Sequence, residues 1–449
     1  MWSRFKERGL IAVVLVVALA APVSAQERVL SLKEALMLGQ RGNPEVRALA
    51  NSVLASEEDV GIARGFLLPK ITFEERFMRT NNPTYAFMAK LNQARFEQSD
   101  FQIPSLNHPR AISDFQTGVS FEQAVFAPKA YLAIDMAKNE SSAKGEEFER
   151  KKEDVAFRVL KTYLGVQTAK AFVGVAGKAV EDAGEHERIA ETRYGAGLGL
   201  YSDMLRARVA LASAEERLVS ARKALAVAKR ALGLTLGLDE SVDAAGERPS
   251  LDLRSEDYYT AAALSRKDLK SLEERYRNAQ NSLKMANAGY LPVFGVGGSY
   301  QLNSHRNPFG EEGDSWQVAA FLRWELFDGA KREHERQKAK HSIAETAEYL
   351  DGMKKQISFL IYDAYLGVGE AKKGLDLARA ALQSAEEGRR LVKTRYENSL
   401  STLVDLLDVQ TSLDGARASV VEKEGAYLTA IANLGFQSGT IMRDLGLRE

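Results

Sequence analysis

Three long series of mostly apolar residues recur at alternating steps of four and three, the spacing of helices that pack side by side. They span residues 204–232, 357–385 and 406–434, and large residues alternate with small ones in each. This spacing predicts long helices in coiled-coil contact, and the small residues let the helix axes approach closely. No proline interrupts residues 129–194 or 330–396. At about 1.5 Å per residue, each of these two stretches predicts a helix of roughly 100 Å.

Four shorter segments alternate apolar with polar residues, which is the period of a β-strand. They lie near residues 70–78, 114–126, 293–302 and 315–327, and the third is rich in glycine and less regular. Strands of about ten residues with one apolar face and aromatic residues toward their ends are typical of a membrane-spanning β-barrel with a polar lumen. A soluble hairpin with one buried face shows the same alternation. The pattern alone leaves both interpretations open.

The chain contains an internal duplication. An Arg-Tyr pair at residues 193–194 recurs 202 positions later at 395–396, and each copy is followed by a turn and an apolar helix. A Leu-Pro pair at residues 68–69 recurs 223 positions later at 291–292. The two offsets differ by 21 residues, so the first copy carries an insertion. Its predicted location is an outer loop at residues 79–111, which is rich in Asn, Pro, Gln and Ser.

These correspondences divide the chain into two copies of a helix, strand, strand, helix unit. The first repeat is predicted at residues 26–237 and the second at 258–436, with an acidic linker at 238–257 and a tail at 437–449. The fold class is α+β and mostly α. Four strands are too few to close a barrel, which takes about eight, and open sheet edges are not stable in hydrocarbon. The sequence therefore predicts a symmetric homo-oligomer that shares its strands.

The first 25 residues have the three parts of a secretory signal peptide. Basic residues at positions 4, 6 and 8 precede an apolar run at residues 10–21, and residues 23–25 supply the small side chains of a cleavage site. The run of 12 residues is too short to cross a bilayer as a helix, which takes about 20. We expect an exported protein whose mature chain begins near Gln26.

Composition excludes several classes of function. The chain has no cysteine, which rules out disulfides and thiol catalysis. Without the three basic residues and the one acidic residue of the signal peptide, 58 basic residues balance 60 acidic ones, so nothing predicts nucleic-acid binding. We find no nucleophile with a positioned base and no cluster of metal ligands, and we predict no enzyme activity, no cofactor and no metal site. The five histidines are expected on solvated, charged faces: His108, His186, His305, His334 and His341.

The signal peptide, the duplication, the Leu-Pro pair before each first strand and the Arg-Tyr pair near each long helix end together resemble the TolC family of outer-membrane efflux and secretion channels. The resemblance covers nearly all of the mature chain. It implies a homotrimer in the lipid of the outer membrane, with a twelve-stranded β-barrel shared by three protomers and a long α-helical barrel in the periplasm. It also implies that a periplasmic adaptor (membrane fusion) protein and an inner-membrane transporter are partners of a passive exit duct.

The same resemblance assigns a role to the turns that follow the two Arg-Tyr pairs. In the family these turns are helical tips that meet the adaptor, which here implies contacts by Gly195, Gly197, Leu198, Ser399 and Leu400. Glycine ends a helix and allows a positive φ. The second tip departs from the family pattern, since Ser399 stands where a glycine is usual, although Ser and Asn also suit a turn.

Asp405 and Asp408 match, by this resemblance, acidic residues that narrow the periplasmic entrance. Their i, i+3 spacing places both on one helix face, and three copies would form a ring of carboxylates that hinders anions. An alternative interpretation is structural, because Thr402 and Asp405 have the spacing of a capping box at the start of the last helix. Asp203 occupies the equivalent position in the first repeat.

Two classes of function therefore remain open. A trimeric outer-membrane channel would require detergent for extraction. A soluble periplasmic coiled-coil scaffold protein, which the helices alone also allow, would be released by osmotic shock. Within the channel class, the partner transporter selects drugs, metals or proteins as cargo, and the sequence does not distinguish them.

Overall fold

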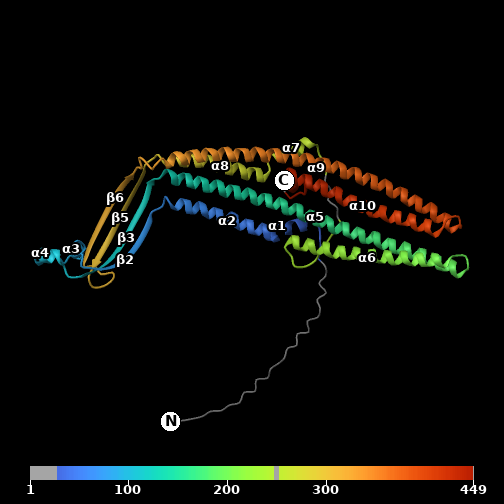
Figure 1. Ribbon diagram of the computed structural model, residues 1–449, viewed down its shortest axis with the longest axis horizontal. Coiled ribbons are helices and arrows are strands. Elements are labelled where there is room, and N and C mark those ends of the chain that lie inside the picture. Colours follow the sequence, from blue (N-terminus) through green and yellow to red (C-terminus); the bar gives the residue numbers. More distant parts are fainter. Residues whose placement is uncertain (1–27, 247–251, 448–449) are drawn as a thin grey trace, which may run out of the picture.

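The computed structural model describes residues 28–246 and 252–447 of the chain. The predicted signal peptide at residues 1–25 lies outside the described residues, and so does part of the predicted linker. The described chain is mostly helical and is extended along one axis, with a β-sheet at one end and two helical hairpins at the other (Figure 1).

Two very long helices form the axis of the molecule. Helix α5, Pro128–Gly195, has 68 residues and helix α9, Lys331–Glu397, has 67. Each turns back into a helix of 36 residues, α6 at Tyr201–Leu236 and α10 at Leu403–Ser438. The two long proline-free helices predicted from the sequence are thereby confirmed. The apolar seam of α9 is buried at Ile357, Ile361, Ala364, Val368, Leu375 and Ala378.

Two helices of 22 residues run beside the long ones toward the sheet. Helix α2, Pro44–Gly65, packs on α5, and α8, Lys267–Ala288, packs on α5 and α9. Asn43 caps the start of α2 through its side chain, and Pro44 occupies the first helical position, where its missing N–H costs nothing. The starts of α2 and α8 differ by 223 positions, which is the offset of the Leu-Pro pairs.

The duplication extends to backbone conformation at the ends of α6 and α10. Gly237 and Gly439 follow these helices with φ of 80° and 75°, a region that only glycine adopts without strain. The residue after each glycine donates its N–H to the carbonyl of Gly233 or Gly435, at 2.9 and 2.8 Å. Both helices therefore end in a Schellman motif, 202 positions apart.

Four strands form one antiparallel sheet in the order β2, β3, β5, β6, which leaves β2 and β6 as edges. The last strand is shorter than expected, because it ends at Arg323 rather than near 327. Beyond it, the carbonyls of Glu325 and Leu326 accept hydrogen bonds from the guanidinium of Arg332 in α9, at 2.9 and 3.0 Å, in place of a neighbouring strand. The four strands cover Lys70–Thr80, Ile112–Phe126, Val293–Ser304 and Gly313–Arg323.

The two faces of this sheet differ in character. One face is apolar and exposed: Phe73, Val119, Tyr300 and Trp316 are neighbours in register and are 45–75% exposed. The next row of neighbours points to the opposite face and is formed by Glu74, Gly118, Gln301 and Ser315. We call these the apolar face and the polar face of the sheet.

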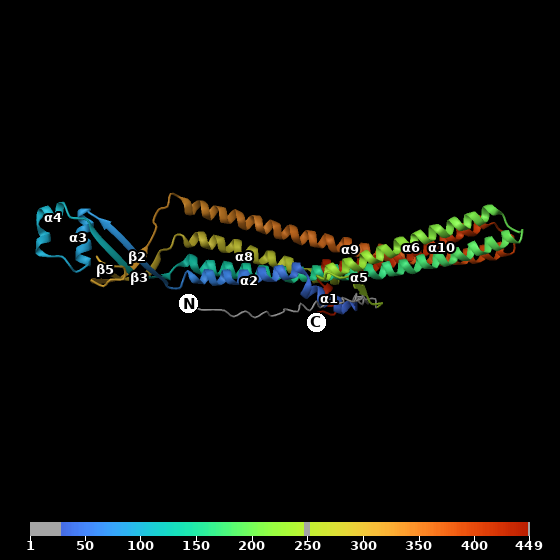
Figure 2. The same ribbon diagram turned by 90° about the horizontal axis from the view of Figure 1, so that it is seen from below.

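The segment predicted as an outer loop is folded rather than irregular. It contains helix α3 at Pro83–Asn92, a 3-10 helix at Gln98–Phe101 and helix α4 at Ile103–Asn107. The Asn82 carboxamide oxygen accepts hydrogen bonds from two backbone N–H groups of the first turn of α3, which caps this helix. The segment lies at the end of the sheet that is farthest from the helical hairpins (Figures 1 and 2).

The segments near the termini and between the repeats gather around the middle of α5. Strand β1, Arg28–Leu30, pairs in parallel with β4, Val242–Ala244, which belongs to the predicted linker. The buried Tyr163 hydroxyl of α5 donates toward the carbonyls of Leu30 and Ala245, at 3.2 and 3.1 Å. Three short helices complete this region: α1 at Leu32–Gly42, α7 at Glu256–Ala263 and α11 at Ile441–Asp444.

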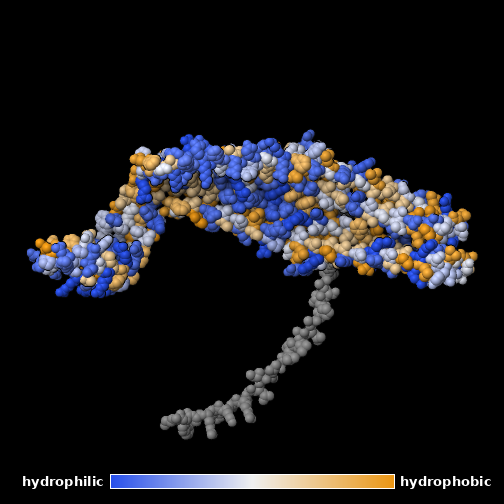
Figure 3. All heavy atoms as spheres, viewed as in Figure 1, coloured by the Kyte–Doolittle hydropathy of each residue, from blue (hydrophilic) through white to orange (hydrophobic). Residues whose placement is uncertain are grey.

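Among the described residues, no helix combines the length and the apolar character needed to cross a membrane. On the face shown in Figure 3, hydrophilic residues cover much of the region around α8 and α9, and hydrophobic residues are interspersed along the hairpins.

Candidate functional site

The candidate site is the free end of the two hairpins, where α5 turns into α6 and α9 turns into α10. In the first turn Gly197 has a φ of 72°, and the N–H of Leu198 donates to the Arg193 carbonyl at 2.8 Å. Gly195 is the last residue of α5. This turn is a Schellman motif with glycine at the left-handed position, as the sequence predicts for a helix end.

The second turn has the same backbone geometry without the glycine. Ser399 has a φ of 61°, and the N–H of Leu400 donates to the Arg395 carbonyl at 2.8 Å. A non-glycine residue pays a steric penalty in this region of about 1–2 kcal/mol. The departure from the family pattern at Ser399 therefore changes the strain of the turn and not its shape.

Both turns present apolar side chains to solvent. Leu198 is 80% exposed and Leu400 is 77% exposed, and each is the residue immediately after the left-handed position. Leu200, at the end of the first turn, is 67% exposed. Large apolar side chains are thus left in water at the tips of both hairpins.

Arg193 holds the two tips together. Its guanidinium donates to the carbonyls of Tyr396 and Glu397 at the end of α9, at 2.9 and 3.1 Å. It also lies 4.5 Å from the centre of the Tyr396 ring, a cation–π arrangement. A cation at the C-terminal end of a helix is further favoured by the helix dipole. The Arg-Tyr pair found in the sequence thus has a structural role in joining the repeats.

Asp405 serves as the capping residue that the alternative interpretation predicts. One of its carboxylate oxygens accepts hydrogen bonds from the Thr402 N–H, the Thr402 hydroxyl and the Ser401 hydroxyl, at 2.8–2.9 Å. The Thr402 hydroxyl in turn accepts from the Asp405 N–H, which completes a capping box. The hydrogen bond from the Thr402 backbone N–H lowers the pKa of Asp405 most, and those from the Thr402 and Ser401 hydroxyls lower it further.

Asp408 lies one turn further along α10, and both carboxylates are exposed. Among the residues that the structure describes, the Asp408 side chain has no hydrogen-bond or ion-pair partner. In the first repeat Asp203 is not part of a capping box, because α6 has no side-chain cap, and it lies 3.7 Å from Arg206. The equivalent acidic positions of the two repeats therefore differ in their contacts.

A buried polar network behind the tips joins α5 to α10, and no pattern along the sequence indicates it. Asp182 of α5 accepts from Gln410 and Arg417 of α10, at 3.1 and 3.0 Å. Arg389 of α9 donates to the Gln410 side-chain oxygen at 3.2 Å. Burial raises the pKa of Asp182, but the hydrogen bond from Arg417 and the nearby cations outweigh it and lower the pKa.

His186 belongs to this network, and its expected place on a solvated face is wrong. It is 1% exposed, and its Nε2 lies 3.5 Å from the Gln410 side-chain oxygen. Burial lowers the pKa of this imidazole. The charged residues around His186 in the sequence indicate an exposed side chain. In the structure, however, α10, more than 200 positions away, covers this side of α5. No local pattern in the sequence carries that information.

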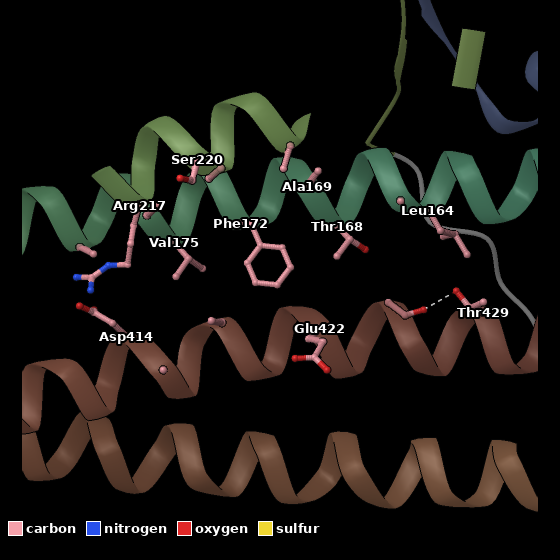
Figure 4. Close-up of a pocket in the computed structure, with 18 of the residues that line it drawn as sticks. Leu164, Thr168, Ala169, Phe172, Val175, Arg217, Ser220, Asp414, Glu422 and Thr429 are labelled. Atoms are coloured by element: carbon pink, nitrogen blue, oxygen red, sulfur yellow. Dashed lines mark hydrogen bonds between the residues drawn. The ribbon is translucent and has the colours of Figure 1, made fainter. Parts of the chain in front are cut away.

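A cavity of about 840 Å³ lies between the hairpins, on the side of the network toward the middle of the molecule. Phe172 and Val175 of α5 point into it toward α10 (Figure 4). Within its lining the hairpins approach closely, because a Cβ at Gly425 would lie 2.6 Å from the Thr168 hydroxyl. The two hairpins are thus in contact at the Asp182 network and again where Thr168 and Gly425 line the cavity.

Comparison with known proteins identifies the family to which the chain belongs. Residues 38–238 and 258–440 match the family model described as outer membrane efflux protein. The chain belongs to the outer membrane efflux protein family. Proteins of this family are channels rather than enzymes, and the chain is located in the outer membrane and extends into the periplasm.

Individual relatives of this efflux protein are distant in sequence but match over most of their length. The alkaline protease secretion protein AprF of Pseudomonas aeruginosa is 22% identical over 92% of this chain and 85% of the relative. The outer membrane protein TolC of Vibrio cholerae is 19% identical over 92% of this chain and 91% of the relative.

Solved structures show the same fold. CusC superposes with a TM-score of 0.78 and 14% identity, over 91% of each chain. The outer membrane protein VceC of Vibrio cholerae superposes with a TM-score of 0.74 and 17% identity, over 91% of this chain and 96% of VceC. The TolC-like fold inferred from the sequence is therefore confirmed.

Among the described residues, no group of three or more acidic, histidine or cysteine side chains is arranged to hold a metal ion.

Proposed function

We propose that three copies of this chain close a shared β-barrel and form an outer-membrane channel. This channel is the passive exit duct of an inner-membrane efflux pump or a type I secretion system. The observation that carries the proposal is the four-stranded sheet with an exposed apolar face and two unpaired edges, β2 and β6. In hydrocarbon such edges need partners. If β6 of one copy pairs with β2 of the next, three copies give a twelve-stranded barrel, which is more than the minimum of about eight.

The helical tips are the proposed contact with a periplasmic adaptor. Leu198 and Leu400 are exposed on turns whose backbone is fixed by Gly197 and Ser399, and Gly195 lies directly before the first turn. We infer that the adaptor covers these leucines and that the adaptor links the channel to its transporter. The relative AprF is an alkaline protease secretion protein, which supports secretion as one role of such ducts.

Asp405 and Asp408 are the proposed acidic ring of the periplasmic entrance. Their exposure on one helix face near the tips supports this role. The Asp405 carboxylate keeps its charge while it caps α10, so both aspartates contribute charge to the proposed ring, and Asp408 is the one whose charge can be removed without loss of the cap.

The assembly is tested with protein extracted from membranes. The channel predicts extraction by detergent, a trimeric mass in detergent and discrete conductance steps in planar bilayers. Release by osmotic shock as a monomer without conductance would instead favour a soluble periplasmic scaffold.

The adaptor contact is tested by placing a photo-crosslinking amino acid at Leu198 or at Leu400 in cells. The expected product is one crosslinked periplasmic protein that mass spectrometry identifies as an adaptor with a helical hairpin. Tyr362 is 52% exposed on α9 and away from the tips, and it is the control position. Equal crosslinking at Tyr362, or none at either leucine, would contradict the contact.

A further inference from the structure

The insertion that distinguishes the first repeat lies on one particular face of the sheet. Asp114 of β3 is 1% exposed and accepts a hydrogen bond from the side chain of Gln93, which follows α3, at 2.7 Å. The same Gln93 amide donates to the Ser113 carbonyl at 2.9 Å. Asn303 of β5 donates to both carboxylate oxygens of Asp114, at 3.0 and 3.1 Å. Asp114 and Asn303 both belong to the polar face of the sheet.

Apolar and backbone contacts place α3 on the same face. Ala86 and Ala89 of α3 form a buried cluster with Ile112, which points to the polar face of β3. At Gly313 of β6, a Cβ would lie 2.1 Å from the Asn92 carbonyl at the end of α3. Only glycine fits there, so the end of α3 lies directly against the edge strand.

The connection at the same end of the second repeat folds the other way. Phe309, between β5 and β6, stacks over Phe73 with ring centres 6.2 Å apart. Phe73 belongs to the apolar face. The two outer connections of one protomer therefore lie on opposite faces of the sheet.

The insertion has contacts of its own that fix its shape. The Lys90 ammonium pairs with Asp100 at 2.5 Å, and this hydrogen bond lowers the pKa of Asp100. Phe96 packs edge to face with both Phe87 and Phe101, at 4.8 and 5.1 Å between ring centres. An internally braced element anchored by a buried carboxylate is built to hold one position.

We propose that α3 and the segment after it form an inward constriction at the outer mouth of the channel. The inference rests on the proposed trimer, in which the apolar face meets lipid and the polar face lines the lumen. Three insertions would then project into the mouth. On the side of α3 away from Ala86 and Ala89 lie Met88 and Leu91, which are 51% and 46% exposed. An apolar constriction of this kind excludes hydrated solutes that would enter from outside.

The test uses the absence of cysteine from the chain, which allows one thiol to be placed at a time. In Met88→Cys the thiol would lie on the lumen side of α3. In the matched control Arg306→Cys it would lie in the other outer connection, where the arginine side chain is 76% exposed. Both variants are reconstituted in planar bilayers, treated with a bulky thiol reagent and checked by mass for complete labelling.

Labelling of Met88→Cys is expected to remove most of the single-channel current, and labelling of Arg306→Cys to leave it unchanged. Replacement of residues 83–109 by a short Gly-Ser turn is expected to increase the conductance several-fold. Full labelling of Met88→Cys with unchanged current would overturn the constriction while leaving the channel proposal intact. Failure of the unmodified chain to form any channel would instead defeat the proposed function, and the constriction with it.

Discussion

Asp182 of α5 and Arg417 of α10 belong to different repeats and are joined by a hydrogen-bonded ion pair of 3.0 Å. Their side chains are 8% and 23% exposed, so the pair is largely withdrawn from water. Beyond this contact the hairpins separate around the cavity lined by Phe172. The pair is therefore a principal link between the two hairpins near the tips.

Replacement of Arg417 by Met is expected to destabilise the protein. It keeps an unbranched apolar stem but removes the guanidinium and leaves the Asp182 carboxylate buried with fewer partners, which costs about 3 kcal/mol. The measurement is thermal unfolding of the protein in detergent. The control is Arg379→Met, which removes an ion pair with Glu424 on a side chain that is 57% exposed and is expected to cost less than about 1 kcal/mol. Equal losses of stability in the two variants would show that the buried ion pair contributes no more than the exposed one.

A second prediction concerns acid. Burial lowers the folded-state pKa of His186, so the unfolded chain takes up a proton more readily than the folded one. Stability is then lost as the pH falls below about 6.5, the usual value for histidine. The Asp182 carboxyl has a lowered pKa, so its contribution is kept above its ordinary value of 3.8 and is lost only as the pH falls further.

The groups facing His186 are Asp182 on its own helix, Arg389 and Lys393 of α9, and Gln410 of α10. His186→Gln is expected to reduce the difference between melting temperatures measured at pH 7.5 and pH 5. His341 is exposed on α9, and His341→Gln is the control that should leave this difference unchanged. An unaltered difference in His186→Gln would argue against histidine as the titrating group.

The sequence predicts those parts of the fold that depend on periodicity and repetition. The proline-free stretches predict α5 and α9, and the series of apolar residues at steps of four and three predict α6 and α10. The Arg-Tyr pairs locate both tips, and the spacing of Thr402 and Asp405 identifies the capping box. These features are local or repeated, and so they can be read along the chain.

Contacts between the repeats cannot be predicted in this way. The Asp182 network needs side chains from α5, α9 and α10 to meet, and nothing near His186 in the sequence shows that α10 covers it. The folded insertion was missed for a related reason. Its helices are short, and α3 is fixed to the sheet by Asp114, Asn303 and Gly313 rather than by its own apolar pattern.

The two tips offer a matched pair of substitutions. Ser399→Gly is expected to stabilise the second hairpin by about 1 kcal/mol, because it relieves a non-glycine residue of its left-handed backbone at φ of 61°. Gly197→Ala introduces the same strain into the first tip and is expected to destabilise it by a similar amount. Thermal unfolding checks both signs. Stabilisation by the alanine, or none by the glycine, would contradict the strain assigned to these turns.

The final prediction separates charge from helix capping at the proposed entrance. Asp408→Asn keeps the shape of the side chain and removes a carboxylate that has no partner among the described residues, so the proposed ring loses charge while α10 keeps its cap. Single-channel conductance is expected to rise, and selectivity for cations over anions to fall. Asp405→Asn changes both the charge and the capping box, and it should also lower the melting temperature. Asp203→Asn in the first repeat is the control. If Asp408→Asn leaves conductance and selectivity unchanged while Asp405→Asn lowers only the melting temperature, the aspartates are structural and the entrance is narrowed by other residues.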